Sequence, residues 1–408
     1  MGGVSMEWKL KDLTVDGKGS YGIGAPAVPY QEDKLTYLRI TDINDDGSLN
    51  FSDLKSVDAE DAEKYILKEN DIVFARTGNS TGRSYFYEKQ HGTFVYAGFL
   101  IKFSLDPNKV NPRILKYYTH SKPYFDWVNS FDTGATRGNI NAKTYGDMEI
   151  ELPSRKVQDK IVSILSSLDR KIELNNKINA DLEEMAQAIF KNWFVDFEPF
   201  KDGKFVDSEL GMIPEGWKVG TLGEFCKCLL GGTPSRSKEE YWNGEVNWIN
   251  SGEINKFRIL EASEKITELG LAKSATKLLP KKTTVLAITG ATLGQVSLLE
   301  IDTCANQSVI GVLENTEVPY EYIYPFIKDR IEMLIQHQTG GAQQHINKDN
   351  VESLIFLLPA INVLEDYISL VSPMYKRIES QCFENLYLSL LRDTLLPRLM
   401  SGELEVPE

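Results

Sequence analysis

Apolar residues recur at intervals of three and four along a stretch that begins at residue 154 and reaches about residue 191. Their positions are Ile161, Ile164, Leu168, Ile178, Leu182, Met185 and Ile189. This spacing is typical of the seam of a coiled-coil helix. A helix of roughly 38 residues would be ~57 Å long, which is longer than most single domains accommodate. The pattern therefore predicts a spacer helix, and a core helix of an ordinary α/β domain is the alternative.

A buried polar position interrupts this predicted seam. With Ile161 at position a of a heptad, Lys171 is the one polar residue at d, and the a positions are Ile161, Leu168, Asn175, Leu182 and Ile189. A polar residue at position a costs stability but fixes the register of paired helices. We therefore expect Asn175 to set the register with a partner helix.

The chain contains one long internal repeat. Trp8-Lys9 is followed by Trp217-Lys218 at an offset of 217 − 8 = 209. Three later pairs of segments keep the same order: 37–44 with 248–255 (248 − 37 = 211), 70–82 with 282–294 (282 − 70 = 212), and 133–154 with 339–360 (339 − 133 = 206). A repeat of this length predicts two copies of one folded unit.

The second copy also ends in a long helical pattern, from residue 362 to about 398. The same heptad, shifted by 206, places Gln381 where Asn175 stands, and its a positions are Tyr367, Met374, Gln381, Leu388 and Leu395. The first helix leads from one unit to the other, and a second helix that packs on it must run back. The pair is therefore expected to be antiparallel, with Asn175 opposite Gln381.

The fold class that follows is α+β, with two duplicated α+β domains separated by a long antiparallel two-helix coiled coil and related by an approximate twofold axis. The predicted boundaries are residues 1–153, 154–210, 211–360 and 361–408. Within each unit, runs such as 71–75 and 148–152 predict strands. Residues 112–130 and 319–338 predict helices, the first of which kinks or restarts at Pro123.

Composition narrows the classes of protein. With 408 residues, 42% of them hydrophobic and 25% charged, the chain is typical of a globular protein of two or three domains. The start has no apolar core of signal-peptide length, and no run approaches a membrane span, so we expect a cytoplasmic protein. The net charge of −14 argues against non-specific coating of nucleic acid. It leaves room for a sequence reader whose loops are basic while its helices carry the acid.

Motifs for catalysis are missing from the sequence. The GxGxxG run at residues 17–22 is followed by Pro26 and Pro29 rather than by the helix that a dinucleotide site requires. The four cysteines and four histidines show no metal-binding spacing, so we expect reduced thiols and no metal. No phosphate loop, adenine-methylase motif or nuclease carboxylate cluster occurs. We therefore predict no catalytic residue in this chain.

Two loops in each unit combine Gly, Thr and Ser with Arg, Asn and Gln, a mixture that suits contacts to phosphates and base edges. The repeated frame with different polar residues favours two modules that read different sequences, although Thr-Gly pairs also make ordinary turns. The candidate DNA-binding residues are Arg76, Thr77, Asn79, Arg83, Thr133, Gly134, Arg137, Asn139, Thr289, Thr292, Gly340, Gln343, Gln344, His345 and Asn347.

The duplicated TG…IN…LP pattern before each long helix, together with AIFKNWFVDFEPF at residues 188–200, resembles the DNA-specificity subunit of type I restriction-modification systems. The resemblance covers essentially the whole chain. It implies a non-catalytic subunit with two target-recognition domains that read double-stranded DNA at a bipartite, asymmetric site with a fixed gap. It also implies methyltransferase subunits and motor-nuclease subunits as partners. S-adenosylmethionine, ATP and Mg would belong to those partners, and this chain would carry no cofactor.

The same resemblance assigns partner binding to the end of the first long helix, at Trp193, Phe194, Asp196 and Phe197, although packing of the helix end is an alternative for Phe194 and Phe197. The second copy departs from the pattern because it ends in LLPRLMSGELE. The two partner surfaces are therefore not expected to be identical. The competing class is a duplicated coiled-coil scaffold that binds proteins and has no DNA specificity.

Overall fold

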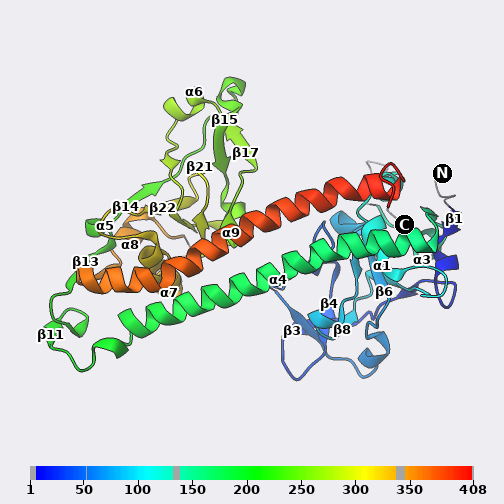
Figure 1. The fold of residues 1–408 in the computed structure, drawn as a ribbon, viewed down its shortest axis with the longest axis horizontal. Helices are drawn as coiled ribbons and strands as arrows, with labels where there is room; N and C mark the ends of the chain where they lie inside the picture. Colours follow the sequence, from blue (N-terminus) through cyan, green and yellow to red (C-terminus); the bar gives the residue numbers. More distant parts are fainter. Residues whose placement is uncertain (1–5, 52, 132–137, 337–344, 407–408) are drawn as a thin grey trace. The chain divides into compact units, whose positions relative to one another are not determined.

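A computed structural model describes residues 6–51, 53–131, 138–336 and 345–406. The chain forms two compact units (Figure 1). The first unit comprises Met1–Lys171 and Leu388–Glu408, and the second comprises Ile172–Tyr387. Each of the two long helices, α4 (Arg155–Phe194) and α9 (Ile361–Met400), therefore contributes to both units.

Three sheets make up the strand framework of the first unit, in the orders β2-β9-β6-β7, β3-β5-β4-β8 and β1-β10. The strands are β1 Met6–Lys9, β2 Ser20–Tyr21, β3 Ala27–Pro29, β4 Thr36–Leu38, β5 Lys55–Val57, β6 Asp71–Ala75, β7 Ser84–Phe86, β8 Phe94–Tyr96, β9 Leu100–Ser104 and β10 Glu149–Leu152. The helices before α4 are α1 Pro112–Tyr118, α2 Lys122–Asn129 and α3 Ala142–Gly146. Strands β6 and β10 match the two predicted strands.

The second unit is built on related sheets, with strand orders β14-β22-β19-β20-β16, β17-β15-β21-β18, β13-β23 and β11-β12. The strands are β11 Phe205–Ser208, β12 Gly211–Pro214, β13 Lys218–Thr221, β14 Lys227–Leu230, β15 Trp242–Ile249, β16 Arg258–Ile259, β17 Glu264–Ile266, β18 Leu278–Leu279, β19 Thr284–Ala287, β20 Val296–Leu299, β21 Thr303–Ala305, β22 Val309–Leu313 and β23 Ile355–Leu358. The helices before α9 are α5 Leu222–Phe225, α6 Glu268–Ala272, α7 Tyr320–Gln336 and α8 Lys348–Glu352.

The duplication is visible in the backbone hydrogen bonds. The Arg76 amide donates to the Phe99 carbonyl, and the Ile288 amide donates to the Ser308 carbonyl in the same way. Near the start of each copy the sequence match is displaced. The Leu10 amide donates to Met148 and the Leu222 amide to Leu354, so the offset there is 222 − 10 = 212 rather than the 209 of the two Trp-Lys pairs.

The helix predicted at residues 112–130 is divided into two. Helix α1 ends at Tyr118 and α2 restarts at Lys122, with Pro123 in its first turn. Proline is tolerated there because the first-turn amides have no partner within the helix. In the second unit the corresponding helix, α7, is continuous and includes Pro325. The predicted restart at Pro123 is confirmed.

Helices α4 and α9 pack antiparallel within each unit. In the second unit Asn175 meets Gln381, whereas Phe194, further along α4, meets Tyr367, an earlier residue of α9. In the first unit Asp169 pairs with Arg392. Residues Ile161 and Leu165, which precede Asp169 on α4, share a core with Leu396 and Leu399, which follow Arg392 on α9. The predicted antiparallel coiled coil is confirmed.

The heptad phase of the first helix differs from the prediction. Asn175 and Ile161 are buried at their a positions, but Met185, placed at d, is 50% exposed. The residues that follow the predicted d positions, among them Leu165, Asn179 and Ala186, are buried instead. An α-helix has 3.6 residues per turn, so a strict heptad drifts around its surface. Among the residues that the structure describes, no helix is long and apolar enough to cross a membrane.

Candidate nucleic-acid interface

The first predicted loop of each unit is a tight turn between two neighbouring strands. It joins β6 to β7 in the first unit and β19 to β20 in the second. Gly78 and Gly290 both have φ of +75°, and Gly82 and Gly294 have φ of +89° and +84°. These left-handed conformations favour glycine at all four positions. The duplication therefore preserves the backbone of the turn.

Two of these glycines are also required by packing. A Cβ atom on Gly82 would lie 2.6 Å from the Val128 side chain of α2, and one on Gly294 would lie 2.4 Å from the Ile335 side chain of α7. Gly82 and Gly294 thus face a helix. Close packing against these helices is therefore one reason for glycine at both positions.

The two predicted loops of the first unit lie against each other. The Ile140 amide donates to the Arg76 carbonyl at 2.9 Å, and Thr77 forms a β-bridge with Asn139. The Thr81 hydroxyl donates to the Gly138 carbonyl at 2.9 Å. In the second unit the Ile346 amide donates to the Ile288 carbonyl at 3.0 Å, the equivalent bond. The candidates Thr133, Gly134, Arg137, Gly340, Gln343 and Gln344 lie outside the described residues.

The described candidates divide into exposed and structurally engaged side chains. Asn79, Asn139 and His345 are exposed, and Thr77, Thr289 and Thr292 are half-buried. Asn347 caps α8, because its side chain accepts from the Asn350 amide at 2.8 Å. DNA contact by these residues stays a prediction.

Arg83 is held by the protein itself. Its Nε donates to Asp45 at 2.6 Å and its Nη1 donates to the Ile43 carbonyl at 3.0 Å. These contacts tie the turn to the segment before β5. These contacts give Arg83 a structural role, and its contact with DNA stays a prediction.

Arg76 is placed differently from Arg83. Its Cζ atom lies 5.3 Å from the Tyr21 ring centroid and 5.8 Å from the Phe99 ring centroid. Its Nε is buried, and no acceptor for it exists in the part of the chain that the structure describes. Arg76 also lines a cavity of about 650 Å³ together with Phe99 and Arg39. Arg39 is neutralised by Asp42, at 2.6 Å.

Sequence reasoning missed Tyr21 and Phe99. Tyr21 lies in β2, within the GxGxxG run, and Phe99 directly precedes β9. Both side chains are exposed, at 45% and 55%. Exposed aromatic side chains beside an arginine are a usual feature of nucleic-acid surfaces. Tyr21 is brought close to Phe99 because Tyr21 pairs with Ile101 in the neighbouring strand. The spacing of residues in the sequence does not reveal this pairing.

Known proteins share this duplicated arrangement. A family model described as the type I restriction modification DNA specificity domain matches residues 12–184 and, a second time, residues 214–381. The two matches together cover well over half of the chain. The chain belongs to the type I restriction-modification DNA specificity family. Each match begins in one globular copy and ends inside one of the two long helices.

Relatives of this DNA specificity chain align along most of its length. It is 29% identical over 299 residues to the type I restriction enzyme MjaIX specificity subunit of Methanocaldococcus jannaschii. This alignment covers 72% of this chain and 69% of that protein. It is 24% identical to the HindI specificity subunit of Haemophilus influenzae, with 84% and 88% covered. The crystal structure of the type I S subunit from M. genitalium matches with a TM-score of 0.57 and 15% identity, covering 98% and 96%. At that identity the likeness shows the fold.

The polar layer of this specificity chain lies within the second unit. The Gln381 side-chain amide donates to the side-chain oxygen (Oδ1) of Asn175 at 3.0 Å. The Asn175 amide donates in turn to Glu384 and to Asn385, each at 2.8 Å. Asn175 and Gln381 are 0% and 1% exposed. The two amides that the heptads placed opposite each other are thus hydrogen-bonded, and their control of register stays a prediction.

A buried ionic cluster attaches α4 to the globular part of the second unit. Glu183 of α4 accepts from Arg258 at 2.6 Å, from the Tyr324 hydroxyl at 2.6 Å and from Lys328 at 2.9 Å. Burial alone would raise the pKa of Glu183, but Arg258 and Lys328 more than offset that effect and hold the pKa below its usual value. Glu183 is therefore ionised, and it fixes α7 and β16 to the helix.

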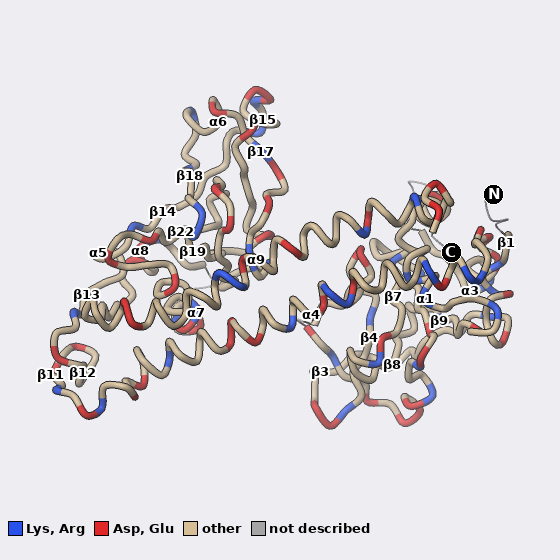
Figure 2. Tube along the Cα trace, viewed as in Figure 1, with Lys and Arg blue, Asp and Glu red and all other residues tan. Residues whose placement is uncertain are grey.

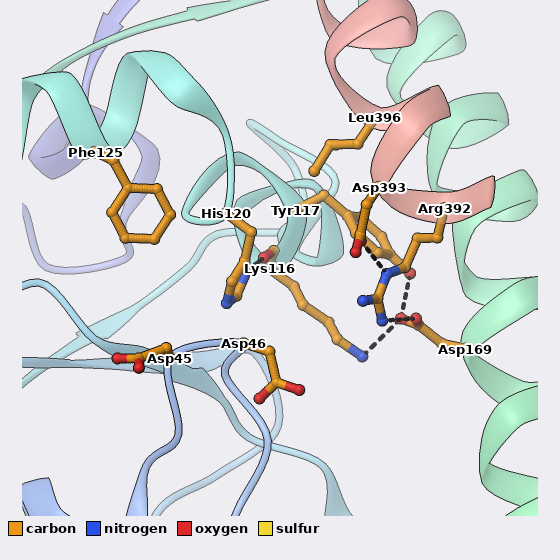
Figure 3. A pocket seen from close by; sticks show the side chains of 10 residues that line it. All are labelled: Asp45, Asp46, Lys116, Tyr117, His120, Phe125, Asp169, Arg392, Asp393 and Leu396. Carbon is orange, nitrogen blue, oxygen red and sulfur yellow. Dashed lines mark hydrogen bonds and ion pairs between the residues drawn. The ribbon is translucent and has the colours of Figure 1, made fainter. Parts of the chain in front are cut away.

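The first unit has a corresponding attachment beside a cavity of about 410 Å³ (Figure 3). Asp169 of α4 accepts from the Tyr117 hydroxyl at 2.9 Å and from Arg392 at 3.1 Å, and Lys116 lies 3.0 Å away. Burial would raise the pKa of Asp169, yet Lys116 and Arg392 lower it overall. His120 lies across the cavity, and burial lowers its pKa.

The end of α4 is mainly a packing surface. Phe194 is 5% exposed and contacts Tyr322, Tyr367 and Trp217. This burial favours the alternative that Phe194 packs the end of the helix, and partner binding by it stays a prediction. Phe197 adopts a left-handed conformation with φ of 54° and packs on Trp217. Partner binding stays a prediction for Trp193, Asp196 and the exposed part of Phe197.

The acidic residues are not concentrated on the two long helices, where the sequence analysis considered them. Taken together, helices α4 and α9 carry equal numbers of basic and acidic residues, which are interspersed along both (Figure 2). The net charge of −14 therefore comes from outside the two long helices. Because the globular parts are acidic overall, any DNA contact must rest on a few local cations rather than on a broad basic surface.

Proposed function

We propose that this chain reads a bipartite DNA sequence, one half-site for each unit, and holds adenine methyltransferase subunits at that sequence without catalysing a reaction itself. The observation that carries the proposal is the duplicated turn. Its backbone is kept in both units, whereas Arg76, Asn79 and Arg83 of the first are replaced by Ile288, Ala291 and Gln295 of the second. A constant frame with different side chains suits two modules that read different base sequences.

The chemistry is assigned to other subunits. S-adenosylmethionine, ATP and Mg would bind to the methyltransferase and motor-nuclease partners, and the assembly would act in the cytoplasm. Within the described ranges, no group of three or more His, Cys, Asp or Glu side chains is arranged to hold a metal ion. The four cysteines are free and buried.

Co-expression with the adenine methyltransferase subunit of the same host tests the proposal. We expect the complex to methylate adenine at one two-part sequence with a fixed gap, as mapped by sequencing that detects methyladenine. The chain alone, supplied with S-adenosylmethionine, should methylate nothing. Methylation without sequence preference, or methylation by the chain alone, would refute the proposal.

A protein-binding scaffold without DNA specificity is the alternative, and the match to the DNA specificity family does not favour it. A gel shift of the complex distinguishes the two. A specific reader retains its cognate duplex against a large excess of unrelated duplex, whereas a scaffold releases both equally. The comparison must be made at a stated salt concentration, since phosphate contacts weaken as salt rises.

A further inference from the structure

Three arginines surround the first turn of the first unit, and two of them have acidic partners. Arg83 is paired with Asp45 and Arg39 with Asp42. For the Arg76 side chain, the described residues supply neither a carboxylate nor a carbonyl acceptor, and its Nε is buried. The two terminal Nη groups are therefore the donors that remain for a ligand. These terminal groups can donate to an acceptor on a ligand.

Two aromatic rings restrict the Arg76 guanidinium. Tyr21 and Phe99 lie 5.3 Å and 5.8 Å from its Cζ atom, within the range of cation–π attraction. The Tyr21 hydroxyl is fixed in turn, because it accepts from the Ala142 amide at 3.1 Å. A side chain that is already ordered loses less entropy on binding. The cluster thus holds the planar guanidinium ready, beside exposed rings.

The second unit has no cation at this place. Matched backbone hydrogen bonds make Ile288 the counterpart of Arg76 and Ser308 the counterpart of Phe99. Leu230 corresponds to Tyr21, since each pairs with the equivalent position of the neighbouring strand, Ile310 and Ile101. Ile288 is 5% exposed. The difference therefore lies in recognition and not in the fold.

The second unit also shows how a purely structural arginine differs. Arg236 stacks on Trp242, with its Cζ 3.6 Å from the ring centroid, and its Nη2 donates to Glu264 at 2.9 Å. Its aromatic contact resembles that of Arg76, but a carboxylate neutralises it. Stacking on an aromatic ring alone therefore does not mark an arginine as a ligand contact. Arg76 differs because none of the residues that the structure describes gives it an acidic partner.

We propose that Arg76, held between Tyr21 and Phe99, reads a guanine in the half-site of the first unit, and that the second unit reads its half-site without an arginine at this position. The inference rests on the proposed function. Arginine donates two parallel hydrogen bonds to guanine O6 and N7, and no other base offers that pair of acceptors in the major groove. Tyr21 and Phe99 are positioning residues that also offer apolar surface to the DNA.

The test uses the methyltransferase complex of the full chain and a plasmid library with randomised half-sites. The wild-type complex should require guanine at one position of one half-site. Arg76→Ala should lower the preference for that guanine by roughly 5- to 140-fold and leave the other half-site unchanged. Arg76→Lys should keep overall affinity but lose most of the preference, since lysine lacks the planar fork.

Two further variants keep the result interpretable. Arg39→Gln alters a neighbouring arginine that is paired with Asp42 and is not a candidate DNA contact, and it should leave the guanine preference intact. Tyr21→Leu installs the residue that the second unit carries at this position, so the fold should tolerate it. It should weaken the same guanine preference more mildly than Arg76→Ala does.

Several outcomes would overturn the inference. Arg76→Ala could weaken binding equally at all sequences and lower the salt dependence by about one counterion, which would make Arg76 a phosphate contact. A wild-type complex whose two half-sites require no guanine, or an unchanged preference in Tyr21→Leu, would also contradict it. If the wild-type complex showed no sequence preference at all, the proposed function itself would fail, and that result is distinct from the others.

Discussion

Replacing Glu183 with alanine should destabilise the second unit strongly. The carboxylate accepts from Arg258, Tyr324 and Lys328 while only 8% of the residue is exposed. Its removal leaves Arg258, which is 4% exposed, with Glu300 as the next carboxylate, 4.0 Å from its Nε. Breaking a buried ion pair by removing one partner typically costs about 3–5 kcal/mol.

The free energy of unfolding should therefore fall by about 3–5 kcal/mol for Glu183→Ala, measured by urea denaturation at pH 7. Glu183→Gln keeps one acceptor oxygen and the shape, so its loss should be smaller. Lys328→Met is the matched control, because the Lys328 side chain is 36% exposed and water can replace its contact. A loss below about 1 kcal/mol in Glu183→Ala would be typical of an exposed pair and would refute the reasoning.

The same carboxylate makes stability depend on pH. Arg258 and Lys328 hold the pKa of Glu183 below its ordinary value of 4.5 in the folded chain. A lowered pKa means that the folded state binds fewer protons than the unfolded state. The stabilisation is complete above pH 4.5 and is lost as pH falls through the folded pKa. Glu183→Gln should flatten the pH dependence of unfolding in this acidic window.

Three further predictions concern other parts of the two units. Asn175→Ala should lower the free energy of unfolding of the second unit by about 1–3 kcal/mol in urea denaturation, since it leaves the buried Gln381 amide without its acceptor. Burial lowers the pKa of His120, so the unfolded chain takes up the proton first and the wild-type protein should lose stability as pH falls below 6.5. His120→Asn should remove this loss, as measured by thermal unfolding. Gly294→Ala should cost more than Gly290→Ala in the same assay: both strain the backbone by roughly 1–2 kcal/mol, but the new Cβ meets Ile335 in the first variant and open space in the second.

Sequence alone predicted the architecture because the architecture depends on periodic and repeated features. The apolar spacing marked α4, and the repeat marked its partner α9. The sequence did not predict correctly which residues of α4 face the partner helix. Ala186 is buried where Met185 was expected, and a small residue at that position allows closer packing than the sequence periodicity suggests. Hydrophobicity alone does not show which of two adjacent apolar residues faces inward.

The candidate site was predicted only in part, because its members come from distant segments. The turn around Gly78 was recognised from its composition, and Arg76 was named with it. Tyr21 and Phe99 reach Arg76 through strand pairing across more than one strand, which no local pattern encodes. Arg83 was named with the same turn, and its ion pair with Asp45, 38 residues earlier in sequence, could not be seen in the local pattern. Its contact with DNA stays a prediction.

The two attachments of α4 explain why specificity can vary while the scaffold stays constant. Tyr117 and Tyr324 occupy matching places in the two copies, 324 − 117 = 207 residues apart, and each donates to a carboxylate of α4, Asp169 or Glu183. Cations surround both carboxylates, so each globular part is fixed to the helix by buried charges rather than by the loops that are predicted to contact DNA. Substitutions at Arg76 or at Ile288 then change what the loop presents without loosening the unit that carries it.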